Sequence, residues 1–414
     1  MNAIDATPLR ACAGRAADVL VETAMVVGGT STWLGVVAGR ADEGDNAIYS
    51  TGQVTLYDGS AGIAMAAWSV ARALGRDDLA KVALGAARHA VATRGPLAAT
   101  GLFDGLAGIG LAAFEVGTCA GDRKLGAGGL DILGQVAAAP PTEVDLIGGS
   151  AGIILALLRV AQLTGAARWR TAARTHGEHL LAVANRHPWG WGWPLAAFDG
   201  RELCGLAHGA AGIAWAMGAL AAATGDSHFL AAVDGARRYE RSWFQRVENN
   251  WPDLRETTQT TPGAALTCPA YWCHGATGIG LSRLALFRLD PHLALIAEAT
   301  SALQAATSAM SRELDGYPAA GLTLCHGLGG SLLLLAAAHH TLGEASHLEA
   351  ARWLAAQALD RLGPDPWAWP SGVPNGGFSA GLMTGLAGAM YVLSRVAEFG
   401  EAEPLAVLGD QGPA

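Results

Sequence analysis

The stretch Ala207–Ala216, "AHGAAGIAWA", contains the pattern that decides the fold: two glycines three positions apart, followed by a run of small and apolar residues. The pattern occurs seven times, at intervals of 44 to 66 residues along the 414-residue chain. One Gly-x-x-Gly step is a weak signal, but seven copies at similar spacing indicate a repeat architecture. The first glycines of the copies are Gly59, Gly105, Gly149, Gly209, Gly275, Gly327 and Gly385.

Each copy leads into an apolar segment of helical length, and a second, more amphipathic segment follows after a short turn. In the first copy, Asp77 or Asp78 can cap the second helix and Gly95 can end it. Glycine suits the start of the first helix, because backbones crowd where several such helices begin near one axis. Strand signals are sparse and are confined to Gln53–Leu56 and Trp189–Trp193.

Arrays of helix pairs form open solenoids or close on themselves. An open solenoid needs polar capping helices at its ends, whereas the first and last copies here are as apolar as the middle ones. We therefore expect an all-α fold, an α/α toroid in which seven inner helices lie inside seven outer helices. We expect a single domain spanning residues 1–414, with the repeats between about 57 and 400.

The composition excludes several classes of protein. A net charge of −9 and a pI near 5.7 argue against a nucleic-acid surface or a polybasic membrane patch. Residues Cys204–Gly225 carry no charge, but they open on a glycine-rich turn, so we expect a buried helix and no membrane span. The N-terminus lacks the order of a signal peptide, and six scattered cysteines are typical of a reduced, cytoplasmic protein.

Aligning the copies on their first glycine shows which residues are candidates for catalysis or metal binding. One position before that glycine stand, in order, Asp58, Asp104, Gly148, His208, His274, His326 and Thr384. Two positions before it stand Tyr57, Phe103, Ile147, Ala207, Cys273, Cys325 and Met383. In a ring of equivalent repeats these positions face one end of the central cavity, so titratable groups from distant parts of the sequence are expected to converge there.

Two Cys-His-Gly motifs supply a candidate metal centre. Cys273, Cys325 and His326 make a plausible zinc site, because zinc prefers thiolate and imidazole donors and catalytic zinc keeps one coordination position open. The residues alone leave open which histidine completes the site, since His274 holds the same register as His326. The alternative is that the cysteines are small buried hydrophobes, but their duplication beside histidines favours a metal.

The register also supplies candidates for proton transfer. His208 has no cysteine before it, which suits a general acid or base more than a metal ligand; the alternative is a core histidine bound to a carbonyl. Asp145 is expected either to orient and charge an imidazole or to cap a helix. Asp58 and Asp104 are expected to be helix caps.

The remaining histidines and aromatic residues are expected to be structural. His176 and His179 are three positions apart on a polar helix, but the sequence contains no HExxH metal motif. The tryptophan-rich loop His187–Pro194 is expected to pack against the protein, with a peptide-binding groove as the alternative.

At these residues the sequence resembles the lanthionine synthetase C-like cyclase family, and within it the cyclase domain of class II lanthipeptide synthetases. The motifs are "LYDGSAGIA", "DLIGGSAGI", "GLAHGAAGIAWA", "YWCHGATGIGLSRLAL", "LCHGLGG" and "GLMTGLAG", and the resemblance covers nearly the whole chain. It implies the toroid fold, with Cys273, Cys325 and His326 as the Zn²⁺ ligands and His208 and Asp145 as acid–base residues.

The resemblance also implies a reaction. A cysteine of a ribosomally made precursor peptide binds Zn²⁺, loses its proton and adds to dehydroalanine or dehydrobutyrine, which closes a lanthionine or methyllanthionine ring. An acid such as His208 then protonates the enolate. Two alternatives remain open: the addition of a small thiol such as glutathione to dehydrated residues, and a precursor-binding scaffold whose zinc is structural, with His274 as a fourth ligand.

The sequence departs from the family pattern in two ways. Stand-alone class I cyclases often carry an aromatic residue after the first ligand cysteine and an arginine shortly before it, where this sequence has His274 and Pro269. The class II type commonly has the histidine, so His274 is a candidate for stabilising the enolate or handling a proton. We expect no dehydratase domain, and therefore a separate dehydratase, kinase or lyase as a partner protein.

Overall fold

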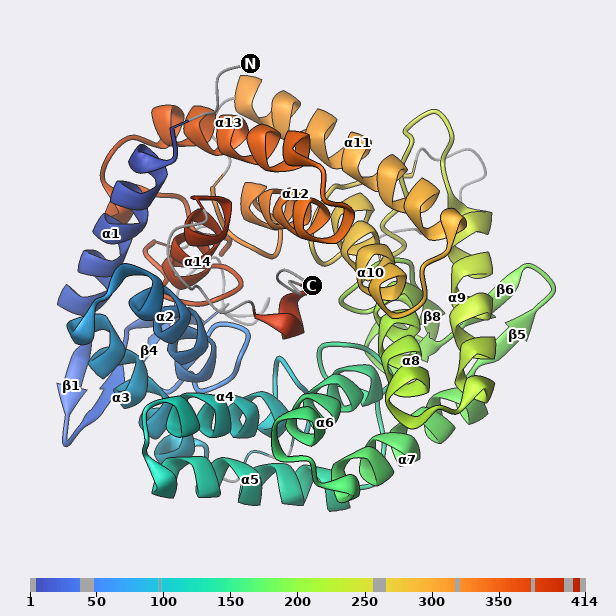
Figure 1. Ribbon diagram of the computed structural model, residues 1–414, viewed down its shortest axis with the longest axis horizontal. Helices are drawn as coiled ribbons and strands as arrows, with labels where there is room; N and C mark the ends of the chain where they lie inside the picture. Colours follow the sequence, from blue (N-terminus) through green and yellow to red (C-terminus); the bar gives the residue numbers. More distant parts are fainter. Residues whose placement is uncertain are drawn as a thin grey trace. The chain divides into compact units, whose positions relative to one another are not determined.

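The computed structural model describes residues 5–37, 48–95, 97, 99–255, 266–316, 321–373, 377–397 and 405–409. Helices predominate in this part of the chain, and its few strands are two or three residues long (Figure 1). Four 3₁₀ turns lie between the larger elements, at Ala196–Phe198, Ser227–Phe229, Pro366–Ala368 and Ala406–Leu408.

Fourteen α-helices lie in the described residues, and they alternate between two kinds. Seven begin directly after the first glycine of a repeat: α2 (Ser60–Leu74), α4 (Leu106–Cys119), α6 (Ser150–Thr164), α8 (Ala210–Thr224), α10 (Ala276–Leu289), α12 (Leu328–Leu342) and α14 (Leu386–Ala397). The other seven are α1 (Thr7–Glu22), α3 (Asp77–Thr93), α5 (Arg123–Ala138), α7 (Ala167–Val183), α9 (Leu230–Trp243), α11 (Leu293–Asp315) and α13 (Ala345–Leu362). The helix pairs predicted from the repeats are therefore present.

The two kinds of helix differ in burial as their sequences require. Helix α8 is uncharged, and all but four of its 15 residues are buried. Helix α9 alternates small residues with arginines and acids, and only one stripe of it is buried. A helix that is apolar all round must be enclosed, whereas an amphipathic helix covers it and faces water with its other side.

Every helix that follows a glycine step is capped by backbone alone. The first N–H of the helix donates to the carbonyl seven residues earlier: Ser60 to Gln53, Leu106 to Ala99, Ser150 to Glu143, Ala210 to Leu203, Ala276 to Pro269, Leu328 to Gly321 and Leu386 to Ser379. The preceding loop thus satisfies a donor that would otherwise lack a partner at the helix start.

This backbone cap corrects two of the predictions. The segment Gln53–Leu56 is a loop that receives the start of α2, and the expected strand there is wrong. The N-cap of α2 is Gly59, without a side-chain cap, so the cap predicted for Asp58 is also wrong. Around Trp189–Trp193, in contrast, strand β6 (Gly190–Gly192) confirms the expectation.

The strands form four short antiparallel hairpins. They are β1 (Met25–Val27) with β2 (Thr30–Thr32), β3 (Gly35–Val37) with β4 (Ile48–Ser50), β5 (Asn185–His187) with β6, and β7 (Pro194–Leu195) with β8 (Arg201–Glu202). The hairpins β1–β2 and β5–β6 are each followed by a buried tryptophan. Trp33 Nε1 donates to the Leu20 carbonyl and Trp193 Nε1 to the Leu180 carbonyl, so each tryptophan ties its hairpin to the preceding helix.

The second glycine of the step is required by close packing in five of the copies. A Cβ on Gly152 would lie 2.2 Å from the Leu146 carbonyl oxygen and 2.7 Å from the Leu102 Cβ of the preceding repeat. The second glycines of the first, fourth, fifth and seventh copies meet the equivalent atoms (Gly62, Gly212, Gly278 and Gly388). A larger residue would therefore push two neighbouring repeats apart.

The chain divides into two compact units. The first comprises Met1–Ala98, Gly108–Ile132 and Met310–Ala414, and the second comprises Ala99–Ala107 and Leu133–Ala309. In the first unit, α1 packs beside α14 (Figure 1), so the N-terminal helix supplies the partner of the last glycine-step helix. In the second unit, α6 packs against α7 and α8 against α9.

Within each unit, the residues two positions before the first glycine are joined by backbone hydrogen bonds. In the second unit Phe103 N donates to the Ile147 carbonyl and Ala207 N to the Cys273 carbonyl. In the first unit Cys325 N donates to the Met383 carbonyl, and Met383 N donates to the Tyr57 carbonyl. Equivalent positions of neighbouring repeats thus lie side by side, as the alignment of the seven copies predicts.

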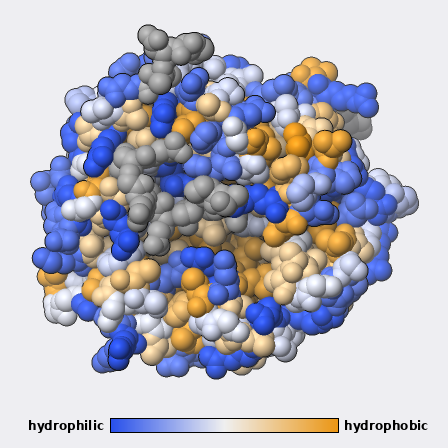
Figure 2. All heavy atoms as spheres, viewed as in Figure 1, coloured by the Kyte–Doolittle hydropathy of each residue, from blue (hydrophilic) through white to orange (hydrophobic). Residues whose placement is uncertain are grey.

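None of the described helices is long and apolar enough to cross a membrane. Helix α8, which holds most of the uncharged stretch Cys204–Gly225, has 15 residues. On the face shown in Figure 2, hydrophilic and hydrophobic side chains are interspersed.

Candidate functional site

The two Cys-His-Gly motifs adopt different backbone conformations. Gly275, after the first motif, has φ +82°, whereas Gly327, after the second, has φ −108°. The first motif is closed into a tight turn in which Tyr271 N donates to the His274 carbonyl at 3.0 Å. A Cβ on Gly275 would lie 1.7 Å from the Pro269 carbonyl oxygen, so only glycine fits this turn. Two identical tripeptides therefore present their histidines differently.

The first of these histidines, His274, is enclosed in the second unit. Its side chain is 0% exposed, and its Nδ1 lies 3.3 Å from the Cys204 carbonyl oxygen. Burial, with the charge of Arg255 nearby, lowers the pKa of His274 to about 4, so the ring is neutral at neutral pH. Because a neutral ring bound to a carbonyl carries its proton on Nδ1, Nε2 bears the lone pair. That Nε2 is buried and has no hydrogen-bond partner among the described residues.

A carboxylate from a separate loop lies beside His274. Asp253 Oδ1 is 3.8 Å from His274 Nδ1, and both carboxylate oxygens accept hydrogen bonds from the Arg255 guanidinium. Burial alone would raise the pKa of Asp253, but the hydrogen bonds and the charge of Arg255 bring it below the usual value. Asp253 thus places a carboxylate, held by Arg255, next to a neutral imidazole. Neither Asp253 nor Arg255 belongs to the repeat register, so sequence reasoning missed both.

His208 and Asp145 form a dyad in the same unit. Asp145 Oδ2 lies 2.5 Å from His208 Nδ1, and Asp145 Oδ1 accepts a hydrogen bond from Gly148 N at 2.8 Å. The carboxylate is thereby fixed at both oxygens, and it holds the imidazole with Nε2 as the second titratable nitrogen. In this geometry Asp145 orients an imidazole, which is one of the two roles that its sequence position suggested.

The His208 ring lies between two other rings. His274 is stacked with it at a centroid distance of 5.9 Å, and the edge of Phe198 approaches it at 5.2 Å. The His208 side chain is 25% exposed, whereas that of Asp145 is 11% exposed, so the imidazole is the part that solvent and ligands can reach. A second carboxyl group adjoins the dyad: desolvation by the surrounding protein and the charge of Asp145 raise the pKa of Asp104 to about 6.

The second Cys-His-Gly motif lies in the first unit, where Cys325 has an unexpected neighbour. The Tyr57 hydroxyl donates to Cys325 Sγ at 2.9 Å. Tyr57 holds the same register in the first repeat as Cys325 does in the sixth. The sequence alignment therefore contained the signal for this pair, although nothing in it assigned Tyr57 a role.

His326 is held by a backbone carbonyl. Its Nε2 donates to the Gly372 carbonyl oxygen at 2.6 Å, which makes Nδ1 the nitrogen that carries the lone pair. Nearby, both Thr384 N and the Thr384 hydroxyl donate to the carboxylate of Asp58. Burial raises the pKa of Asp58 above its usual value. Asp58 therefore joins the first and seventh repeats, which is the role that replaces the predicted helix cap.

The predicted metal ligands are divided between the two units. Cys273 belongs to the second unit, and Cys325 and His326 belong to the first. Within either unit taken alone, the described residues include no group of three or more His, Cys, Asp and Glu side chains arranged to hold a metal.

Cys325 and His326, the two predicted ligands that lie in the first unit, nevertheless have the chemistry of metal ligands. A sulfur that accepts a hydrogen bond is disposed to be a thiolate. An imidazole whose other nitrogen is bound to a carbonyl is the usual form of a metal-bound histidine.

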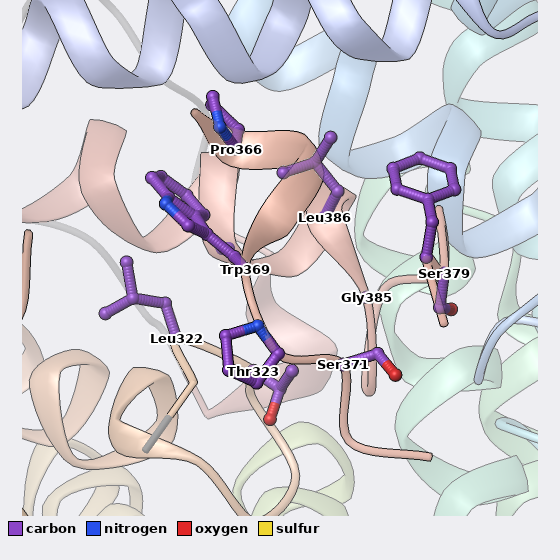
Figure 3. Close-up of a pocket in the computed structure, with 11 residues that line it drawn as sticks. Leu322, Thr323, Pro366, Trp369, Ser371, Ser379, Gly385 and Leu386 are labelled. Carbon is purple, nitrogen blue, oxygen red and sulfur yellow. The ribbon is translucent and has the colours of Figure 1, made fainter. Parts of the chain in front are cut away.

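A small, open pocket adjoins this half-site (Figure 3). Its lining includes Thr323, two residues before Cys325, and Ser371, one residue before the Gly372 carbonyl that holds His326. Trp369 and Phe378 supply much of the apolar wall. Trp367, which is 52% exposed, stacks on Phe378 at 4.3 Å.

The residues that the sequence marked as structural are mostly packed. In the loop His187–Pro194, Trp193 is buried and Trp191 lies under Arg186, while Trp189 is exposed and stacks on His187. His176 is buried, and its Nδ1 lies 3.0 Å from the Ser150 hydroxyl.

Comparison with known proteins identifies the fold and a family. The model of the family described as "Lanthionine synthetase C-like protein" matches residues 50–403. Among solved structures, nisin cyclase matches with a TM-score of 0.65 at 18% identity, covering 87% of this chain and 92% of its own. The Lin0763 protein from Listeria innocua matches with a TM-score of 0.53 at 11% identity, covering 94% and 97%. Among curated proteins, none matches the sequence.

The structural likeness shows the fold alone. The expected fold class, an all-α α/α toroid, is confirmed by the match to nisin cyclase. A GH76 α-mannanase of Bacteroides thetaiotaomicron also shares the architecture, with a TM-score of 0.50 at 10% identity over 94% of this chain and 96% of its own. Because one architecture serves different reactions, function must be argued from the site.

Proposed function

The chain belongs to the lanthionine synthetase C-like family, and from that premise we propose that it is a zinc-dependent peptide cyclase. Its substrate is a precursor peptide that carries cysteines and dehydrated serine or threonine residues, and its product is a thioether ring. The observation that carries this proposal is the Asp145–His208 dyad, stacked on His274 beside the Cys273 backbone. A scaffold that only bound a peptide would have no need of an imidazole oriented by a carboxylate.

Cys273, Cys325 and His326 would hold the zinc ion. Two thiolates and one neutral imidazole balance the charge of Zn²⁺, and three protein ligands are typical of a catalytic zinc. When bound, the ion supplies one piece of chemistry: it ionises the thiol of the peptide cysteine at neutral pH. The tautomer of His326, fixed by the Gly372 carbonyl, leaves Nδ1 as the donor atom.

The dyad would supply the proton that completes the addition. When a thiolate adds to the β-carbon of a dehydro residue, the electron pair of the alkene moves toward the carbonyl, and the α-carbon must then gain a proton. His208 in its protonated form delivers that proton from Nε2, while Asp145 stabilises the imidazolium through Nδ1. The 25% exposure of His208 allows water to recharge the ring.

The neutral state of His274 supports one of its two candidate roles, the handling of a proton. A hydrogen-bond donor to an enolate needs a proton on the nitrogen that faces it, and the proton of His274 is on Nδ1, directed at the Cys204 carbonyl. We propose that His274 Nε2, which bears the lone pair, accepts a hydrogen bond from the thiol of the peptide cysteine, and that water takes up the proton when the thiol ionises.

We include in the proposal a separate dehydratase, kinase or lyase that supplies the dehydrated residues of the substrate. The cyclase step itself needs only a thiol, an alkene, and a proton acceptor and donor.

The test combines metal content with activity. Wild type, Cys325→Ala and Cys273→Ala are analysed for zinc and incubated with a dehydrated, cysteine-containing peptide, with Cys119→Ala as the control at an exposed cysteine. We expect one zinc ion and loss of the peptide thiol in wild type and in the control only, with no change in peptide mass. A mass increase with added glutathione would identify thiol transfer instead. Zinc binding without any thiol loss would identify a scaffold.

A further inference from the structure

Tyr57 reaches the sulfur of Cys325 from a different repeat. Its hydroxyl donates to Sγ at 2.9 Å, although 268 residues separate the two along the chain. Two backbone hydrogen bonds link the sixth, seventh and first repeats at this level. Cys325 N donates to the Met383 carbonyl, and Met383 N donates to the Tyr57 carbonyl. The long side chain of tyrosine thus spans the seventh repeat to touch the sixth.

We propose that Tyr57 is a positioning residue for the Cys325 thiolate, and that its hydrogen bond withdraws electron density from this sulfur. The proposal rests on the function proposed above and goes beyond it, because it assigns different roles to the sulfurs of the site. Cys325 becomes a permanent ligand of low nucleophilicity and does not compete with the sulfur of the substrate.

The chemistry explains why such a device is useful. The proposed reaction brings two protein thiolates and one peptide thiolate together near an electrophilic alkene. An addition by the wrong sulfur would join the peptide to the enzyme. A hydrogen bond to a charged acceptor is stronger than one between neutral groups, and it stabilises the ligand as a thiolate while lowering its reactivity. Groups that contact a metal ligand commonly tune the metal site in this way.

The geometry also favours Tyr57 over a purely packing residue. A tyrosine that only filled space would be expected to direct its hydroxyl to water or to a backbone carbonyl, as Tyr239 does with the carbonyl of Glu202. Tyr57 directs it at a sulfur that the family resemblance independently marks as a metal ligand. Tyr239→Phe is therefore the matched control, since it removes a buried hydroxyl without touching a sulfur.

Cobalt substitution measures the effect of the Tyr57 hydrogen bond on the Cys325 sulfur without catalytic turnover. Wild type, Tyr57→Phe and Tyr239→Phe are loaded with Co²⁺, and the sulfur-to-cobalt charge-transfer band is recorded. Removing a hydrogen bond from a thiolate raises the energy of its electrons, so the band of Tyr57→Phe is expected to move to longer wavelength. Zinc affinity, measured by competition with a chelator, is expected to fall about 10-fold in this variant, as is usual when a partner of a metal ligand is lost. The control is expected to match wild type in both measurements.

A second measurement covers the case in which Tyr57→Phe does not fold. Fluorotyrosine incorporated at all six tyrosines is a stronger hydrogen-bond donor and keeps the shape of the side chain. The charge-transfer band is then expected to move to shorter wavelength. An unchanged band in both experiments, or an equal shift in Tyr239→Phe, would overturn the role of Tyr57. A wild type that binds no cobalt would instead remove the zinc proposal on which it rests.

Discussion

Asp145 Oδ2 lies 2.5 Å from His208 Nδ1, and this carboxylate is itself fixed by the backbone N–H of Gly148. The relationship joins the loop before α6 to the loop before α8, and so links two neighbouring repeats. It also fixes the proton of the neutral imidazole on Nδ1.

Asp145→Asn is expected to slow ring closure at least about 100-fold, because an amide neither stabilises an imidazolium nor fixes its tautomer. The measurement is the rate of thiol loss from a dehydrated peptide under single-turnover conditions. His208→Asn should lose a similar factor, and the double variant should lose little more, since the two residues act as a unit. Asp131→Asn, at an exposed acid on α5, is the control. Additive losses in the double variant would contradict the dyad.

Gly275→Ala is expected to destabilise the protein by about 3 kcal/mol or more, because alanine is strained at φ +82° and its Cβ would overlap the Pro269 carbonyl. Chemical denaturation measures the change. The matched control is Gly343→Ala, which ends α12 at φ +74° with open space around it, and which is expected to cost about 1–2 kcal/mol. Equal losses in the two variants would show that crowding at Gly275 is unimportant. Since Cys273 and His274 belong to the same turn, zinc content should fall with Gly275→Ala only.

Arg283→Met is expected to cost about 3–5 kcal/mol, because it leaves the carboxylate of Glu240 buried without its partner. Both side chains of this ion pair are 0% exposed. Adding Glu240→Gln to Arg283→Met should restore a large part of the stability, as urea denaturation would show. Arg76→Met, which breaks exposed ion pairs, is the control and should cost less than about 1 kcal/mol.

The same pair should also affect the site. Glu240 Oε1 accepts a hydrogen bond from Gly205 N, at the start of the loop that carries His208. We expect Glu240→Gln alone to slow ring closure more than it weakens zinc binding. An equal loss of both would assign the network to stability alone.

Stability is expected to fall as the pH is lowered from 7 to 5. Burial lowers the pKa of His176 to about 4, so between pH 6.5 and 4 the unfolded chain binds a proton that the folded chain does not. The stability from this neutral histidine is thus present above pH 6.5 and is lost as the pH falls. The loss is about 2 kcal/mol by pH 5. Thermal denaturation of His176→Asn should show a smaller pH dependence than wild type, and that of His292→Asn, at an exposed histidine, an unchanged one.

The sequence by itself determined the helical repeats. Gly-x-x-Gly followed by an apolar run sets where seven helices begin, because only glycine fits where a Cβ would strike both the preceding loop and the neighbouring repeat. The alignment on Gly59 and its equivalents also determined which residues would be neighbours. Backbone hydrogen bonds between such positions, as from Ala207 to Cys273, follow directly from that register.

Tertiary structure alone decided what the titratable residues do. His274 and His326 stand in the same tripeptide, yet the positive φ of Gly275 buries the first against the Cys204 carbonyl, whereas the second binds the Gly372 carbonyl. Asp58 was predicted as a helix cap and instead binds Thr384, because the start of α2 is already satisfied by the Gln53 carbonyl. Tyr57 contacts the Cys325 sulfur although 268 residues separate the two along the chain. Partners brought from distant segments set protonation and hydrogen bonding, and these determine the chemistry.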